Sequence, residues 1–120
     1  MATCSTCTPP RKLWTKLPNS AEPAKAASDA LAAVTANEGF AAGIAAAQAV
    51  ADTAKAAEEV GFSTADVAKI AKAVGDEFIT RGSTAGQAAA NGARAHLDTI
   101  KNNRAPRNAN DVIKEATQTR

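Results

Sequence analysis

The fold is decided by residues 37–82, which read NEGFAAGIAAAQAVADTAKAAEEVGFSTADVAKIAKAVGDEFITRG. Near its middle, Val60-Gly61-Phe62-Ser63 divides this stretch into two helical segments. Gly61 can adopt the left-handed conformation that ends a helix, and Phe62 can then fold back onto the last turn. Ser63 suits the cap of a second helix, with Asp66 three positions on as a partial capping box. We therefore expect two helices joined by one tight turn.

Helical spacing and capping signals extend outward from this hairpin on both sides. The expected helices cover residues 21–36, 38–60, 64–79, a segment from Ser83 or Thr84 to about residue 100, and a short piece at 110–117. A continuous helix through Asn37-Glu38-Gly39 is the alternative for the first junction. No segment alternates apolar and polar residues as a strand does.

Three of these helices carry an apolar stripe that predicts the buried face. In the second helix the stripe is Phe40, Ile44, Ala47, Ala51 and Ala54, with Val50 and Val60 beside it. In the third it is Val67, Ile70, Ala71, Val74 and Phe78, and in the fourth Gly86, Ala90, Ala93, Leu97 and Ile100. The sequence thus predicts an all-α, alanine-rich helical bundle of about four main helices plus a short C-terminal helix. Its expected parts are an extended N-terminal arm at 1–19, the bundle at 20–101, and a linker with the short helix at 102–120.

The core of such a bundle is thin. The chain has 120 residues, enough for one domain, and 32 of them are alanine. Val, Ile, Leu and Phe together number 18, a share below the roughly 20% that separates folded from disordered chains. A net charge of only +2 argues against disorder. Since alanine buries little area, we expect a marginally stable domain that associates with other protein chains, either copies of itself or a larger complex.

The hairpin also carries a family resemblance. The run Ala-Glu-Glu-Val-Gly-Phe-Ser-Thr-Ala-Asp-Val-Ala-Lys, residues 57–69, resembles the helix-turn-helix opening of the HU/IHF class of bacterial DNA-bending proteins. In that class the hairpin serves dimerisation, so the resemblance implies a dimerising hairpin here. Residues 83–95 are helical in pattern, where that class continues with a sheet and basic arms. No functional residue is therefore carried over.

Two apolar groups are candidates for partner binding. Leu13, Trp14 and Leu17 lie in a segment rich in proline and small polar residues. A large anchor such as Trp14 suits an arm docked on another chain, or one folded back over its own helices. Val112 and Ile113 lie on the last helix, which is too short to be stable alone in water and needs a surface to lie on.

Positive charge is concentrated at the two ends of the chain. Residues 1–20 and 101–120 each carry a net charge of +3, whereas residues 21–100 carry −4. The candidate polyanion contacts are Arg11, Lys12, Lys16, Lys101, Arg104 and Arg107. Binding to nucleic acid through them would be non-specific and salt-dependent. The alternative is that these charges only keep an alanine-rich chain soluble.

Catalytic and metal-binding patterns are sparse. Cys4-x-x-Cys7 is half of a zinc site, so these cysteines are weak candidates for a metal site or a disulfide shared with another chain, or incidental thiols, or a redox centre. His96 is the sole histidine and has no ligand four residues away on its helix. The sequence has no phosphate-binding loop, no nucleophile elbow and no zinc-protease motif. We expect no enzyme activity, no cofactor and no small-molecule substrate.

No apolar run reaches the roughly 18 residues of a membrane span, and the start lacks the apolar core of a secretory signal. We expect a soluble protein inside a cell or packaged in a particle, without a signal peptide. The expected function is that of a non-catalytic structural or assembly subunit of a larger complex, for example a small virion component of the bacteriophage kind. The alternative is a small nucleic-acid-associated protein with basic ends and a helical dimerisation hairpin.

Overall fold

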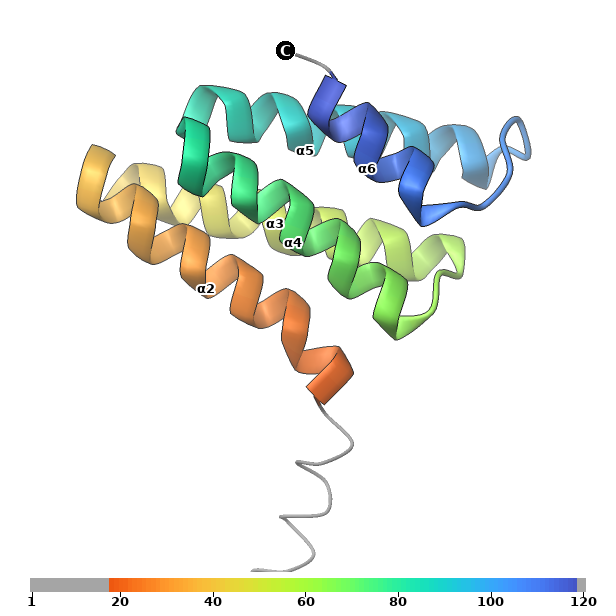
Figure 1. Cartoon of the computed structure of the whole chain (residues 1–120), viewed down its shortest axis with the longest axis horizontal. Helices are drawn as coiled ribbons and strands as arrows, with labels where there is room; N and C mark the ends of the chain where they lie inside the picture. The colour runs from red at the N-terminus through yellow and green to blue at the C-terminus, as the bar shows by residue number, and fades with distance from the viewer. Residues whose placement is uncertain (1–17, 119–120) are drawn as a thin grey trace, which may run out of the picture.

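The computed structural model describes the backbone of residues 18–118 and the side chains of residues 23–118. Within that span the chain is all-α, as predicted, and contains no strand (Figure 1). The helices are α2 (Pro18–Glu38), α3 (Phe40–Val60), α4 (Thr64–Arg81), α5 (Ser83–Lys101) and α6 (Ala109–Gln118). Each agrees with a predicted helix to within a few residues, and Gly39 separates the first two. Residues 1–17, most of the predicted arm, lie outside the described part of the chain.

The turn between α3 and α4 has the predicted geometry. Gly61 has φ 105° and ψ 17°, the left-handed conformation. The N–H groups of Gly61 and Phe62 donate to carbonyl oxygens of the last turn of α3 at 3.0 and 3.2 Å, which completes a Schellman motif. The Ser63 hydroxyl oxygen accepts a hydrogen bond from the Asp66 N–H at 3.2 Å and so caps α4. Both helix ends are therefore specified by local sequence.

Helix α5 ends in the same way without a glycine. Asn103 has φ 61°, the one non-glycine residue of the described chain with positive φ. Its N–H donates to the Ile100 carbonyl at 2.9 Å, and the Arg104 N–H donates to the Thr99 carbonyl at 2.9 Å. Asparagine tolerates the left-handed conformation better than other residues that carry a Cβ. This second Schellman motif turns the chain toward α6.

The helices pack as a two-layer zigzag. Helices α2, α4 and α6 form the near layer in Figure 1, and α3 and α5 lie behind them. Each helix contacts the next one in the chain and the one after that, so α3 lies against α2, α4 and α5. Helix α4 is central, because it contacts all four other described helices. The arrangement is a stack of helical hairpins in which each helix contacts mainly its neighbours.

The stack repeats in detail. Gly39 joins α2 to α3 with φ 100° and ψ 165°, and Gly82, 43 positions later, joins α4 to α5 with φ 95° and ψ −179°. In both joints the glycine N–H donates to a carbonyl four residues back, that of Thr35 or Phe78, at 3.0 Å. A methyl group at Gly43 would meet the Thr35 side chain, and one at Gly86 would meet the Phe78 ring. The hairpin α2–α3 therefore has the same local geometry as α4–α5.

Helix α6 matches the beginning of a third unit. The Asn108 side chain accepts a hydrogen bond from the Asn110 N–H at 2.9 Å, and Asn108 precedes α6 as Ser63 precedes α4. Residues 109–114 read Ala-Asn-Asp-Val-Ile-Lys and residues 64–69 read Thr-Ala-Asp-Val-Ala-Lys. Val112 is buried, as is its counterpart Val67. Helix α6 thus lies on α4–α5 as α4 lies on α2–α3.

The predicted stripes of α4 and α5 are confirmed, since every residue in them is buried. The predicted stripe of α3 is wrong in part: Phe40, Ile44 and Ala51 are exposed, whereas Ala54 and the adjacent Val50 are buried. The buried face of α3 is rotated from it and consists of Gly43, Ala46, Ala49, Val50, Thr53, Ala54 and Ala57. Thr53 satisfies its hydroxyl by donating to the Ala49 carbonyl at 2.8 Å. Because alanine occurs on both sides of α3, the spacing of apolar residues does not distinguish its two faces.

Candidate functional site

An apolar surface lies on the N-terminal half of α3. The Phe40 side chain is 65% exposed and Ile44, one turn later, is 37% exposed. Ala41 and Ala45 beside them are also exposed. We call these four residues the α3 outer face. Large apolar side chains that stay in water cost free energy, and a cluster of them on one helix face is typical of an interaction site.

An apolar groove lies at the other end of the same helix, where α3 passes the start of α2. It has a volume of about 350 Å³ and is lined by Pro23, Ala24, Ala51, Ala54, Lys55 and Glu58. We call it the α2–α3 groove. Its floor is made of small side chains, and its two charged residues belong to α3. A groove of this composition can accept apolar side chains but offers no set of groups for acid–base chemistry.

Three predicted polyanion contacts lie around the connection from α5 to α6. Lys101, Arg104 and Arg107 are all exposed. Arg107 Nη1 donates to the Val60 carbonyl at 3.3 Å, so this side chain ties the connection to the C-terminal end of α3. Glu59 lines the same groove of about 400 Å³ as Lys101 and Arg107. This end of the molecule is positive on balance, with an acidic residue among the cations.

The last helix receives its surface from the chain itself. Helix α6 lies on α4 and α5. Val112 is completely buried there, and Ile113 is half-buried against the same core. Of the two residues predicted to bind a partner from α6, Ile113 alone is accessible. The contact that Val112 needs is therefore made within the chain.

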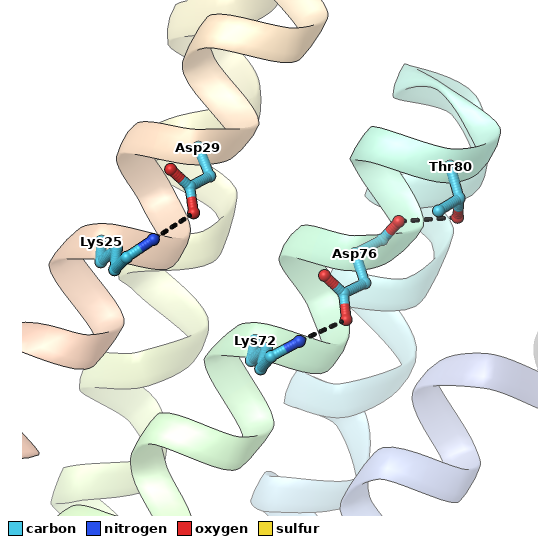
Figure 2. Close-up of polar contacts among 5 residues, drawn as sticks. All are labelled: Lys25, Asp29, Lys72, Asp76 and Thr80. Carbon is cyan, nitrogen blue, oxygen red and sulfur yellow. Dashed lines mark hydrogen bonds and ion pairs between the residues drawn. The ribbon is translucent and has the colours of Figure 1, made fainter.

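Charged pairs on the near layer link successive turns of the same helix. Figure 2 shows Lys25 beside Asp29 on α2 and Lys72 beside Asp76 on α4, with N···O distances of 3.0 and 3.1 Å. Thr80 donates to the backbone carbonyl of Asp76 at 2.7 Å. All four charged side chains are more than half exposed, and such pairs contribute about 0.3–0.5 kcal/mol each. They stabilise two helices and do not form a reaction centre.

The remaining predicted site residues lie outside the described chain. These are Cys4, Cys7, Arg11, Lys12, Leu13, Trp14, Lys16 and Leu17. Among residues 23–118, no group of three or more His, Cys, Asp or Glu side chains could hold a metal ion. His96 is half-buried on α5.

Sequence reasoning missed both the α3 outer face and the α2–α3 groove as surfaces, because it assigned Phe40, Ile44 and Ala51 to the core. The signal that could have identified them is the 43-residue repeat marked by Gly39-x-x-x-Gly43 and Gly82-x-x-x-Gly86. At the position of Ile44 the second unit has Gln87, a polar residue. An apolar residue where the matching unit has a polar one indicates a surface specific to the first hairpin.

Comparison with known proteins identifies no relative of this chain. No family model, no curated protein and no solved structure matches the chain. Within the described residues, no helix has the length and apolar character required to cross a membrane. What the fold defines is the class of architecture, a short all-α stack of helical hairpins.

Proposed function

We propose that this protein is a non-catalytic structural or assembly subunit of a larger complex. The observation that carries the proposal is the α3 outer face, on which Phe40 is 65% exposed. The core beneath it consists largely of alanine. A chain with so few large apolar side chains gains more than most by burying those that it exposes.

The contact extends beyond two side chains. A stable interface buries at least about 1,000 Å² in total, which Phe40 and Ile44 cannot supply alone. The neighbouring residues Ala41, Ala45 and Gln48 are exposed and small or uncharged. A partner helix can approach closely along such a face. The partner is another protein chain, either a second copy or a different component, and a small virion is one kind of assembly with this need.

The test begins with the mass of the purified full-length chain in solution, measured by light scattering at several concentrations. We expect association that weakens at least tenfold in a Phe40→Ser, Ile44→Ser double variant. Ile79→Ser is the matched control, because Ile79 is 39% exposed, as Ile44 is 37% exposed, and belongs to α4 and not to the α3 outer face. If the wild type associates only with another component, the same variants are compared for incorporation into that complex. Equal association of all variants, or a monomer that enters no complex, would contradict the proposal.

The second candidate function is non-specific binding to nucleic acid. The observation that favours it is the exposure of Lys101, Arg104 and Arg107 on one connection, with Lys69 lining a groove beside Arg107. Such binding to a DNA duplex should weaken steeply between about 50 and 200 mM salt. Binding that is unchanged over this range, or no binding at low salt, would exclude this mechanism.

A further inference from the structure

The two hairpins differ in what covers them. Helix α3 lies against α4 and α5, so the side of the second hairpin that faces the first is covered. The corresponding side of the first hairpin carries the α2–α3 groove. Ala24, which lines the groove, and Ser28, one turn further along α2, are exposed, although their counterparts 43 positions later, Val67 and Ala71, are fully buried. The repeat therefore places a site for one more element between α2 and α3, at the position that α3 takes on α4–α5.

The zigzag identifies the element that belongs in this site. Each helix of the stack contacts the two that follow it in the chain. The element that covers α2 and α3 should therefore be the segment immediately before α2. That segment ends at residue 17, and residues 18–22 of α2 separate it in the chain from Pro23, the first residue that lines the groove.

The register of the repeat selects residues within that segment. A shift of 43 positions matches Leu13, Trp14 and Leu17 to Ala56, Ala57 and Val60 of α3. All three α3 residues belong to the packed side of that helix: Ala57 is buried, and the other two are half-buried against the core. The only large apolar residues before α2, apart from Met1, thus fall on the packing positions of the repeat.

The charged residues of the segment fit the same register. Lys12 and Lys16 match Lys55 and Glu59, both of which are exposed. Arg11 departs from the pattern, because its counterpart Ala54 is buried. The match therefore covers residues 12–17 and ends there, because residues 18–20 belong to α2, whereas their counterparts Gly61, Phe62 and Ser63 form the turn before α4.

We propose that residues 12–17 of the same chain dock into the α2–α3 groove, with Trp14 as the apolar anchor. The occupant is an intramolecular segment, and it leaves available to a partner the α3 outer face, whose nearest residue, Ala45, lies six positions before Ala51. This inference concerns the groove alone and does not depend on the proposed function. With residues 12–17 docked, the first hairpin is covered by this segment as the second hairpin is covered by α3.

The experiment uses the fluorescence of Trp14, which is unambiguous because the chain has one tryptophan and no tyrosine. The full-length protein is measured under reducing conditions at a concentration where light scattering shows a monomer. We expect emission shifted to the blue and acrylamide quenching well below that of a peptide of residues 1–17. Ala51→Glu and Ala24→Glu each place a carboxylate in the groove and should raise quenching to the level of the peptide. Ala95→Glu, at an exposed alanine of α5, is the control and should leave Trp14 protected.

Circular dichroism of each variant verifies that the helices remain, and the wild-type measurement does not depend on any variant. Emission and quenching equal to those of the peptide in the wild type would overturn the proposal. Protection that both groove variants leave intact would overturn the assignment of the groove. Protection that appears only as the protein dimerises would show that the segment docks on a second copy, which also contradicts the intramolecular site.

Discussion

Gly86 determines how α4 packs on α5, because it carries a hydrogen atom where alanine would carry a methyl group. A Cβ there would lie within 3.0 Å of the Phe78 ring, including its Cγ atom, which is not the flexible end of the side chain. Phe78 is buried and has no space into which to move. The ring can therefore lie on α5 only because residue 86 has no side chain.

Gly86→Ala should lower the free energy of unfolding by about 1–3 kcal/mol through overpacking. This loss exceeds the gain of up to about 1 kcal/mol that alanine offers in a helix. Gly75→Ala is the comparison, because its nearest neighbour, the Ala26 carbonyl oxygen, would lie at 3.2 Å and a small shift relieves the contact. Urea unfolding of both variants, and of Gly86→Ala combined with Phe78→Leu, should show the larger loss at Gly86 and its partial recovery in the double variant. Equal losses at the two glycines would contradict the packing argument.

Asn103 provides a second test at this scale, because its backbone is in the left-handed region at φ 61°. Asn103→Val should lower the free energy of unfolding by about 1–2 kcal/mol, the cost of that conformation for a residue with a bulky side chain. Asn103→Gly should be neutral or stabilising. Asn102, with φ −87°, is the matched position where valine should cost little. Thermal unfolding of the three variants checks whether Asn103→Val is the least stable and Asn103→Gly the most stable. If Asn103 acted through its side chain, Asn103→Gly would also be destabilised.

At the scale of single elements, helix ends could be predicted from the sequence because their causes are local. Ser63 caps α4 as its position before Thr64 indicated, and it accepts a hydrogen bond from Asp66. Ser63→Ala should therefore lower the free energy of unfolding by about 1 kcal/mol. Ser28→Ala, at an exposed position inside α2, should be neutral or slightly stabilising because alanine favours helix. Chemical unfolding of both variants makes the comparison, and a similar loss for each would rule out a capping role.

The orientation of α3 could not be predicted, and the reason is physical. Helices α4 and α5 carry valine, isoleucine, leucine and phenylalanine on one side, so their buried faces are marked by volume. Helix α3 has alanine or glycine on every side, and its largest residue, Phe40, lies on the exposed one. Its orientation is determined by where α2, α4 and α5 contact it, and the spacing of apolar residues in α3 does not reveal those contacts. The candidate surfaces depend on this orientation, so that spacing could not predict them, and the sequence signal that indicates them is the 43-residue repeat.

At the scale of the whole molecule, stability should vary along the stack. Helix α4 contacts four other helices, whereas α2 and α6 each have two main neighbours among the described residues. Helices that contact mainly their neighbours unfold in order of how many neighbours they have. Hydrogen exchange under native conditions should therefore protect amides of α4 most and those of α2 and α6 least. Uniform protection across all five helices would indicate one cooperative unit instead.

The single glycine that joins the two helices of each hairpin has a consequence for how such molecules can vary in length. Because Gly39 and Gly82 have nearly the same backbone angles, the second helix of each hairpin leaves its joint in the same direction relative to the first helix. A chain built this way forms an open stack, since its last hairpin does not return to contact its first. Hairpins can be added at either end of the stack while those in the middle keep their neighbours. The length of the molecule can therefore change by whole hairpins without changes to the residues packed in its interior.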